Sequence, residues 1–329
     1  MSQMPLYPLR FAPIYQYRLW GGRRLGETLS EPLPGSDPIG EAWVLSDRAD
    51  HQSLVANGPL KGQSLGQLME HSREALMGKL ASRFTRFPLL LKFLDAQTML
   101  SVQVHPSDAH PELIPAGDTA KTEAWVVIEA EKDSQIYAGL KSGTTEKILR
   151  SSLEDETIAD HLVCIHPKPG DAVFIPAGTV HTLGDGVVVF EVQQNSDVTF
   201  RLYDWGHIDP RTKASRPLQV DHAIACIDFG ASDAGLVAAR VETSTPVERE
   251  RLFDCPAFLL CRLIGQDPFP VGATAEPRVL VCIAGSGQVT HNQIPYSVGK
   301  GDVWLLPAEA GVCAFQPSGE TTLLEIAIP

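Results

Sequence analysis

Short β-rich runs of mostly apolar residues, separated by glycine and proline, dominate the chain. Five of these runs are FPLLLKFL (87–94), TMLSVQVH (98–105), EAWVVIE (123–129), DAVFIPA (171–177) and GVVVFEVQ (186–193). Runs of this length between turn residues are typical of strands in an all-β sandwich or barrel. The 27 glycines and 25 prolines supply many turn residues, so the sequence predicts a mainly β fold.

Three segments have helical spacing instead. One is 65–80, where five large apolar residues fall near one face: Leu65, Leu68, Met69, Leu76 and Leu80. The second is 144–162, with Thr144 or Thr145 as its N-cap. The third opens at Pro217, and its apolar residues are spaced by four and three: Val220, Ile224 and Ile227. We therefore expect a few helices attached to the β structure.

A faint internal repeat divides the chain. GDAVFIPAGTVH (170–181) returns as GDVWLLPAEAGV (301–312), each copy having Gly-Asp, an apolar strand and Pro-Ala. Two copies predict two related β-barrels. The second copy has Val312 where the first has His181, so we expect it to bind no metal. Small, polar and charged residues at 229–250 indicate a linker between the barrels, or a continuing strand.

The segment 100–106 carries polar residues of metal-ligand type at alternate positions. Ser101, Gln103 and His105 share one face if the segment is a strand. Leu100, Val102 and Val104 then point into a core. The polar face offers an amide oxygen and an imidazole nitrogen, which are both ligands for a divalent metal.

Two further segments complete a candidate metal site. The strand 121–128 sets Lys121 and Glu123 on one face, and His181 follows a Pro-Ala-Gly turn. Two histidines and a carboxylate are a common protein contribution to a catalytic zinc site, with Gln103 as a weaker fourth ligand. Nitrogen and oxygen ligands without thiolate also suit manganese, iron or nickel.

The segment 190–206 predicts a long strand interrupted by the polar bend QNSD. Glu191 and Arg201 lie on either side of this bend, and they meet only if the chain curls there. An exposed amphipathic strand is the alternative.

The net charge and the composition restrict the classes of molecule that this protein could bind. With 27 Lys+Arg and 40 Asp+Glu, the formal net charge is −13, which argues against nucleic acid or an anionic membrane. An anionic substrate would need a local basic pocket. We find no apolar run near ~20 residues and no signal-peptide pattern. Six scattered cysteines indicate reduced thiols in a cytoplasmic protein, with disulfides as the weaker alternative.

Taken together, these stretches resemble type I phosphomannose isomerases, in particular their short bacterial form. The matching stretches are WGGRRL (20–25), IGEAWVLSD (39–47), KFLDAQTMLSVQVHP (92–106), KTEAWVVI (121–128), GDAVFIPAGTVHTLG (170–184) and EVQQNSDVTFRLYDWG (191–206). The resemblance implies two cupin-type double-stranded β-helix (jelly-roll) barrels with a few α-helices attached to the first. Residues 1–228 would form the metal-binding catalytic domain with a helical insertion. Residues 229–250 would be the linker, and 251–329 a degenerate C-terminal barrel.

The resemblance also implies an activity and a set of site residues. The family interconverts mannose 6-phosphate and fructose 6-phosphate with one bound Zn²⁺. The implied metal ligands are Gln103, His105, Glu123 and His181. The implied catalytic residues are Arg201, Lys121 and Glu191, and the implied substrate-binding residues are Ser101, Lys121 and Arg201.

An aldose–ketose isomerase moves a proton between C2 and C1 through an enediol, so it needs a general base. Glu191 is the first candidate, Lys121 is its rival, and Asp197 is a further one. The main alternative function is a non-catalytic cupin that binds a sugar or sugar phosphate in a regulatory role. Another metal-dependent cupin enzyme, such as an oxygenase, and a structural β protein without a ligand are the other readings.

Overall fold

The β-rich runs form strands in the computed structural model, which describes residues 5–231 and 234–329. Each of the five runs contains one strand: β6 (Leu89–Ala96), β7 (Val102–Val104), β8 (Glu123–Ala130), β11 (Ala172–Ile175) and β13 (Val187–Gln194). The prediction of a mainly β chain is confirmed. Strand β8 begins at Glu123, so Lys121 lies in the segment before the strand and not on it.

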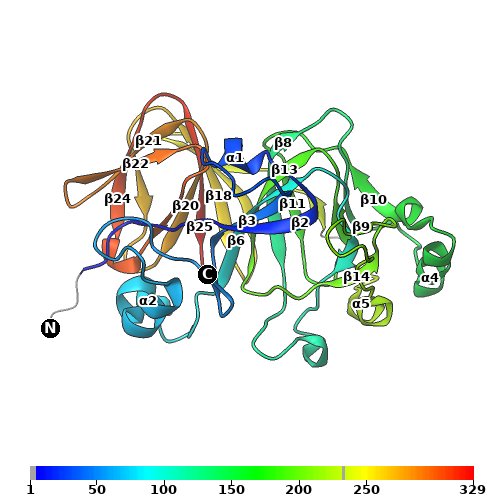
Figure 1. Ribbon diagram of the computed structural model, residues 1–329. Coiled ribbons are helices and arrows are strands. Elements are labelled where there is room, and N and C mark those ends of the chain that lie inside the picture. Colours follow the sequence, from blue (N-terminus) through cyan, green and yellow to red (C-terminus); the bar gives the residue numbers. More distant parts are fainter. Residues whose placement is uncertain (1–4, 232–233) are drawn as a thin grey trace.

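Two sheets make up an N-terminal unit, drawn mainly in cyan and green in Figure 1. The larger sheet has the order β15-β11-β8-β13-β6-β2-β3, and its further strands are β2 (Ile14–Gly22), β3 (Ile39–Leu45) and β15 (Gly235–Leu236). The smaller sheet has the order β10-β9-β12-β7-β14, with β9 (Ile136–Leu140), β10 (Leu162–Ile165), β12 (His181–Leu183) and β14 (Phe200–Tyr203). A separate ribbon pairs β4 (Asp47–Arg48) with β5 (His51–Gln52).

A second pair of sheets forms a C-terminal unit beside the first (Figure 1). Its larger sheet has the order β1-β23-β20-β25-β18-β17-β16, built from β1 (Leu9–Arg10), β16 (Arg240–Thr243), β17 (Glu248–Asp254), β18 (Leu259–Gly265), β20 (Arg278–Ala284), β23 (Val303–Leu306) and β25 (Thr321–Ala327). The smaller sheet has the order β19-β24-β21-β22, from β19 (Phe269–Gly272), β21 (Ser286–His291), β22 (Ile294–Gly299) and β24 (Val312–Pro317).

Each unit borrows a strand from the other end of the chain. Strand β1 pairs with β23 of the C-terminal unit, and β15 pairs with β11 of the N-terminal unit. The segment 229–250 contains β15, β16 and the start of β17, so its described part includes strands, as the second reading of this segment expected.

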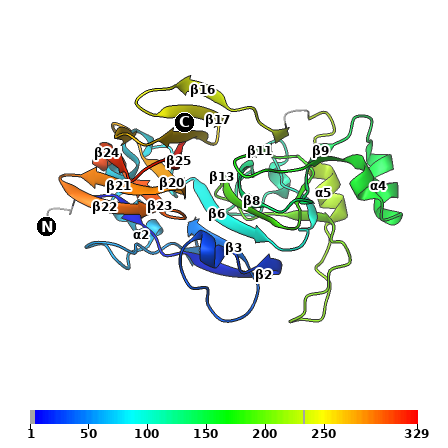
Figure 2. The same cartoon turned by 90° about the horizontal axis from the view of Figure 1, so that it is seen from above.

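The two large sheets pack against one another, and the alternation along their strands explains where side chains point. On β13, Val188, Phe190 and Val192 belong to the core that both large sheets share. Val187 and Val189 belong to a separate core inside the N-terminal unit. Because side chains alternate between the two faces of a strand, Glu191 points into the N-terminal unit. Figure 2 shows the two units side by side from above.

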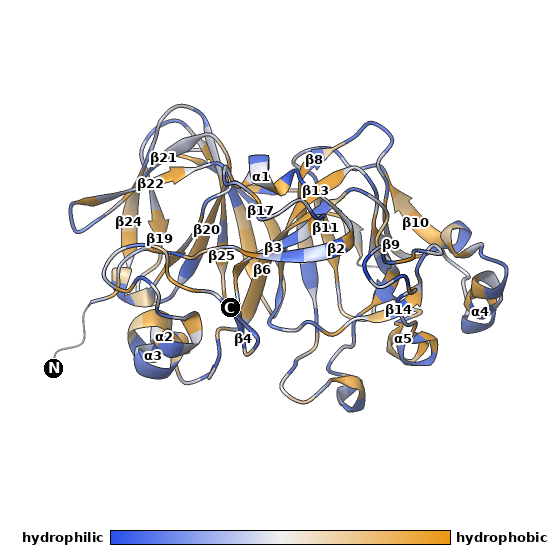
Figure 3. Ribbon diagram, in the orientation of Figure 1, coloured by the Kyte–Doolittle hydropathy of each residue, from blue (hydrophilic) through white to orange (hydrophobic). Residues whose placement is uncertain are grey.

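The helices lie at the edges of the two units (Figures 1 and 3). Their bounds are α1 (Leu25–Thr28), α2 (Leu65–His71), α3 (Arg73–Met77), α4 (Glu146–Glu154) and α5 (Val220–Cys226), with 3-10 turns at η1 (Gly78–Leu80), η2 (Pro111–Leu113), η3 (Ile158–His161) and η4 (Ala308–Ala310). Helix α4 begins after the predicted cap Thr145, whose hydroxyl accepts a hydrogen bond from the backbone N–H of Ile148. Within the described chain, no helix combines the length and the apolar character of a membrane span.

The predicted helix over 65–80 is interrupted. Ser64 caps α2 through a capping box, but the helical axis breaks at Ser72, and Gly78 ends α3. Gly78 adopts φ +55°, and a side chain there would collide with the backbone of Ala275. Helices α4 and α5 lie on the N-terminal unit, as expected, whereas α3 also packs against η4 of the C-terminal unit.

Candidate metal centre and cavity

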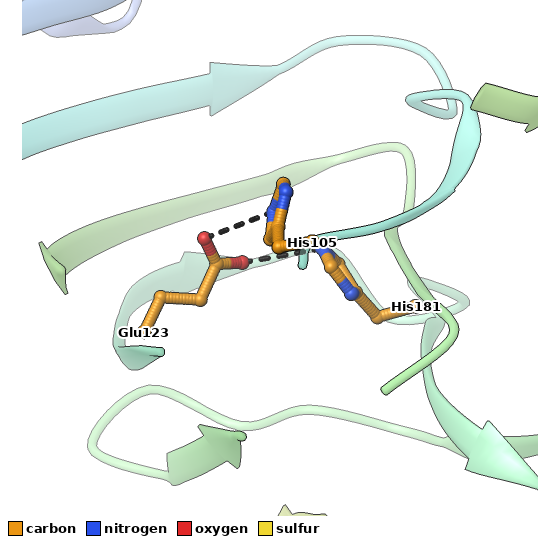
Figure 4. A group of neighbouring side chains, drawn as sticks. All are labelled: His105, Glu123 and His181. Atoms are coloured by element: carbon orange, nitrogen blue, oxygen red, sulfur yellow. Dashed lines mark ion pairs between the residues drawn. The ribbon is translucent and has the colours of Figure 1, made fainter. Parts of the chain in front are cut away.

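Three buried side chains from three strand ends meet inside the N-terminal unit (Figure 4). His105 follows β7, Glu123 opens β8 and His181 opens β12. His105 Nε2 lies 3.3 Å from Glu123 Oε2, and His181 Nε2 lies 3.2 Å from Glu123 Oε1. One potential ligand atom from each residue falls within 4.8 Å of the others. The sequence predicted this grouping, and the structure brings all three together.

Backbone carbonyls orient both imidazoles. His105 Nδ1 lies 2.8 Å from the carbonyl oxygen of Val198, and His181 Nδ1 lies 2.9 Å from that of Thr179. Since a carbonyl only accepts, each Nδ1 carries a proton, and Nε2 is the ring nitrogen that faces Glu123 and could bind a metal. Outer contacts of this kind fix the tautomer of metal-binding histidines.

A glycine turn positions His181. Gly178 adopts φ +89°, a left-handed conformation that favours glycine, and its N–H donates a 2.9 Å hydrogen bond to the carbonyl of His105. The Pro-Ala-Gly turn of the sequence therefore joins the segments that carry the two histidines.

Protonation states within the triad favour metal binding. Burial, followed by the charge of Lys121, lowers the pKa of His105 to about 3, so this imidazole is neutral at pH 7. Burial alone would raise the pKa of Glu123, but Lys121 and His105 outweigh it and hold this pKa well below its usual range. Both Glu123 oxygens are buried, and neither accepts a hydrogen bond of normal geometry. A neutral imidazole at His105, the second imidazole of His181 and an ionised carboxylate with unsatisfied oxygens fit a divalent metal ion.

The predicted fourth ligand lies beside the triad. Gln103 is paired directly with His181 across β7 and β12, and its Nε2 lies 3.2 Å from His181 Nε2. Turning the amide by 180° would present Oε1 at the same place. Ser101 is buried one alternation earlier, and its hydroxyl donates a 3.3 Å hydrogen bond to Gln103 Oε1.

A cavity of about 360 Å³ opens beside the metal centre. Of the predicted site residues, Ser101, Gln103, Lys121, Glu191 and Arg201 line this cavity, as does Asp197. In the smaller sheet, His181 pairs with Gln103 and Gln103 pairs with Arg201. Because neighbouring strands are ~4.8 Å apart, this row leads from the triad to the arginine within about 10 Å of backbone.

Glu191 is buried, and one of its two carboxylate oxygens accepts a hydrogen bond. Trp125 Nε1 donates a 2.9 Å hydrogen bond to Glu191 Oε1. Glu191 Oε2 accepts no hydrogen bond and lies 3.5 Å from Lys92 Nζ. Burial, followed by the nearby charge of Glu123, raises the pKa of Glu191. A carboxyl with a raised pKa is suited to exchange protons near neutral pH.

Lys121 lies between the triad and the cavity. Its Nζ is 3.1 Å from Glu123 Oε2 and 3.1 Å from His105 Nε2. The ion pair with the buried Glu123 fixes the position of the Lys121 nitrogen beside the triad. This contact places Lys121 at the metal end of the cavity that it lines.

Arg201 is half-buried, and its guanidinium makes no ion pair with any described residue. Its Nε is buried without a hydrogen-bond partner. Burial, followed by the charge of Arg216, lowers the pKa of Arg201, although an arginine stays protonated at neutral pH. An uncompensated cation that lines a cavity can bind an anion.

Sequence reasoning missed a charged network on the opposite wall. Lys92 on β6 is buried, and its Nζ lies 3.9 Å from Glu41 Oε2, 3.5 Å from Glu191 Oε2 and 3.7 Å from Asp197 Oδ1. Burial alone would lower the pKa of Lys92, but Glu41 and the other carboxylates raise it instead. The available signal was one lysine in the otherwise apolar run LLLKFL.

Glu41 connects this network to the rim of the cavity. Arg18 donates from Nε and Nη2 to the two Glu41 oxygens at 3.1 and 3.0 Å, and Trp43 Nε1 donates at 2.6 Å. Burial would raise the pKa of Glu41, but Arg18 and Lys92 lower it to about 2. Glu41 is therefore ionised throughout the neutral range.

Comparisons with known proteins identify the family of this chain. Residues 9–124 match the family model described as phosphomannose isomerase type I, catalytic domain. The mannose-6-phosphate isomerase ManA of Bacillus subtilis is 35% identical over 94% of this chain and 95% of its own length. A Streptococcus mutans mannose-6-phosphate isomerase is 34% identical over 88% of this chain and 89% of its own.

A solved structure shares the whole fold. The crystal structure of a Bacillus subtilis mannose 6-phosphate isomerase has a TM-score of 0.89 and 28% identity, covering 98% of this chain and 99% of that one. This likeness confirms the predicted cupin fold. The extent of sequence identity shows in addition that the chain belongs to the type I phosphomannose isomerases.

Proposed function

We propose that this protein is a metal-dependent aldose–ketose isomerase that interconverts mannose 6-phosphate and fructose 6-phosphate. The observation that carries the proposal is the buried His105–Glu123–His181 triad beside a cavity that is lined by an arginine without an ion pair. A phosphorylated sugar needs both features, because its carbonyl end must be polarised while its phosphate is held. The names of the relatives point to the same substrates.

The metal that we propose is Zn²⁺, one per chain, held by His105, Glu123, His181 and Gln103. Two histidines and a carboxylate are a common protein contribution to catalytic zinc sites, and Gln103 would be a weaker fourth ligand. When bound, a divalent cation would act as a Lewis acid on the sugar oxygens at C1 and C2 and so make the C2 proton more acidic.

In this proposal Glu191 moves the proton between C2 and C1. Support comes from its raised pKa, its uncommitted Oε2 and its place in the cavity wall. The Trp125 hydrogen bond holds the carboxyl group in one orientation. Asp197 is the weaker candidate because its side chain is 45% exposed, and water would compete for the proton.

The remaining predicted residues take part in binding. Lys121, held by Glu123, is placed to donate a proton or hydrogen bond to a sugar oxygen near the metal end of the cavity. Arg201 is our candidate for binding the phosphate, and Ser101 adds a buried hydroxyl beside Gln103. The geometry that supports each role is contact with one shared cavity.

We also propose a domain organisation for the chain and a cellular compartment for the protein. Residues 1–228 would carry catalysis, 229–250 would connect, and 251–329 would serve as a degenerate barrel without metal. The six cysteines are free, which supports a reducing compartment such as the cytoplasm. The net charge of −13 supports a small-molecule substrate in preference to nucleic acid or a membrane surface.

The test combines metal analysis with a coupled isomerase assay on mannose 6-phosphate, with and without chelator. We expect about one zinc per chain and activity that chelation removes and added zinc restores. His181→Ala should lose both metal and activity while it remains folded by circular dichroism. The matched control is His166→Ala, which removes an exposed histidine. Full metal content and turnover in His181→Ala would contradict the ligand set, and tight sugar binding without turnover in the wild type would favour the regulatory alternative.

A further inference from the structure

A second arginine faces the cavity from the loop between β14 and α5. Arg216 lines the cavity together with Arg201, although the two residues are separated by the whole of this loop. Figure 2 shows the loop, in yellow-green, reaching out from the N-terminal unit on the side of β2. No role follows for Arg216 from the metal centre or from the proposed proton transfer.

An ion pair with Asp204 fixes the orientation of the Arg216 side chain. Its Nε donates a 2.9 Å hydrogen bond to Asp204 Oδ2, and its Nη2 contacts Asp204 Oδ1. Asp204 is buried and follows the last residue of β14, so the pair is anchored on the same strand as Arg201. This arrangement commits two of the three guanidinium nitrogens. Within the described residues, Nη1 of Arg216 has no hydrogen-bond acceptor.

Arg18 is the remaining arginine that lines the cavity, and it differs from Arg216 in how many of its guanidinium nitrogens have an acceptor. Arg18 also uses Nε and Nη2 for a carboxylate, Glu41, but its Nη1 donates a 3.1 Å hydrogen bond to the carbonyl of Tyr17. All three of its nitrogens are therefore satisfied by the protein. Arg201 and Arg216 are the two cavity arginines with uncommitted donors among the residues that the structure describes.

The loop that carries Arg216 is also fastened at its far end. Asp209 accepts a 3.0 Å hydrogen bond from the hydroxyl of Tyr17, and Arg211 lies 3.4 Å above the Tyr17 ring. Arg211 also pairs with Asp37. These contacts join the loop to β2 and to the segment before β3, so Arg216 reaches the cavity from a fixed support.

We infer that Arg216 is a second anion-binding residue of this cavity, and that Arg201 and Arg216 together bind the phosphate group of the sugar substrate. The inference rests on the proposed isomerase function and adds the residue that, with Arg201, selects phosphorylated over unphosphorylated sugars. Two guanidinium groups that face one cavity repel each other, and a phosphate dianion between them removes this repulsion. Burial, followed by the charge of Arg216, lowers the pKa of Arg201, although the nearby Asp204 raises it.

The chemistry of the two groups suits a phosphate better than a hydroxyl. Guanidinium nitrogens present several donors in one plane, and they match the oxygens of a phosphate in pairs. Arg201 lies in register with Gln103, whereas Arg216 lies beyond the end of β14. The phosphate would thus be held away from the triad, which leaves the carbonyl end of the sugar at the metal.

The experiment compares metal-loaded wild type with Arg216→Lys, Arg216→Gln and the control Lys213→Gln, which removes an exposed charge from the same loop. Arg216→Lys keeps the charge opposite Asp204 and guards against misfolding. For both Arg216 variants, we expect KM for mannose 6-phosphate to rise about 10- to 100-fold, the factor for one charged hydrogen bond. The inhibition constant of inorganic phosphate should rise in parallel, with kcat changed much less. Lys213→Gln should alter both by less than about threefold, because exposed charges act weakly.

Two further measurements separate phosphate binding by Arg216 from a structural role for this residue. Calorimetric titration of inorganic phosphate into each protein reports binding without turnover, so it remains informative if the wild type proves not to be an isomerase. Turnover of unphosphorylated mannose, where measurable, should not differ between wild type and the Arg216 variants. A fall in kcat and in melting temperature, with unchanged phosphate binding, would overturn the inference in favour of a structural role for Arg216. Unchanged KM and unchanged phosphate inhibition in both Arg216 variants would also overturn it.

Discussion

The hydrogen bond from Trp125 to Glu191 gives a direct test of the proposed base. Trp125→Phe keeps a buried aromatic ring beside His181, whose ring centroid lies 5.7 Å from that of Trp125. The substitution shortens the ring and removes the Nε1–H that donates at 2.9 Å to Glu191 Oε1. This hydrogen bond stabilises the ionised carboxylate and therefore lowers the pKa of Glu191. Its loss should raise that pKa further.

The size of the change follows from the strength of a charged hydrogen bond. Such a bond contributes about 1.5–3 kcal/mol, and one pKa unit corresponds to about 1.36 kcal/mol. We expect the pKa of Glu191 to rise by about one to two units. If Glu191 must be ionised to accept the C2 proton, the acidic limb of the pH profile of kcat should move to higher pH by the same amount.

The assay is the pH dependence of kcat for mannose 6-phosphate between pH 5 and pH 9, with metal content checked at each end. The matched control is Trp43→Phe, which removes an equivalent 2.6 Å hydrogen bond from Glu41. The pKa of Glu41 is lowered to about 2, so even a two-unit rise leaves this group ionised across the assay range. An acidic limb that stays in place in Trp125→Phe, or moves equally in Trp43→Phe, would remove Glu191 as the base.

Three other variants test the cavity, the charged network and the core. Arg201→Lys should lose at least about tenfold in kcat/KM despite its retained charge, because the planar donor array is gone; wild-type kinetics would exclude Arg201 from the site. Glu41→Gln should be less stable at pH 7, since Arg18 and Lys92 lose a partner, yet its free energy of unfolding should fall less steeply with acid. The depressed pKa of Glu41 stabilises the fold above about pH 4.5, and this contribution disappears as the pH falls toward about 2; urea unfolding at several pH values measures the slope, and parallel curves would contradict the assignment. Phe190→Ala should lower the free energy of unfolding by about 3–5 kcal/mol, because this ring is fully buried against Phe93 at 5.2 Å. A loss below about 1 kcal/mol on denaturant unfolding would show that the shared core tolerates a cavity there.

The metal triad could be predicted from local sequence because each residue is marked by its immediate surroundings. His105 stands at the end of an alternating strand, and His181 follows a turn that requires Gly178. Strand alternation also placed Gln103 correctly beside the histidines. These signals extend over a few residues, so they survive without knowledge of how the sheets pair.

The opposite wall of the cavity could not be predicted in this way. Lys92, Glu41 and Arg18 come from three different strands, β6, β3 and β2, and meet only because those strands are adjacent in the larger sheet. The sequence around each of these residues indicates only one polar position in a strand. Likewise, Glu191 and Arg201 lie on different sheets, since the chain leaves β13 at Gln194 and re-enters the smaller sheet at Phe200. The bend QNSD marked this change of direction without specifying the sheet to which the chain returns.

The internal repeat explains why the C-terminal unit is a poor candidate for a second metal site. His181 and Val312 hold equivalent repeat positions and each opens a strand, but His181 is fully buried whereas Val312 is 56% exposed. Inside that unit, Phe269 and Phe315 pack at 5.1 Å within a core of apolar side chains. The large C-terminal sheet also supplies one side of the core behind β6 and β13. Because these strands carry Lys92 and Glu191 on their other face, the C-terminal unit supports the wall of the cavity.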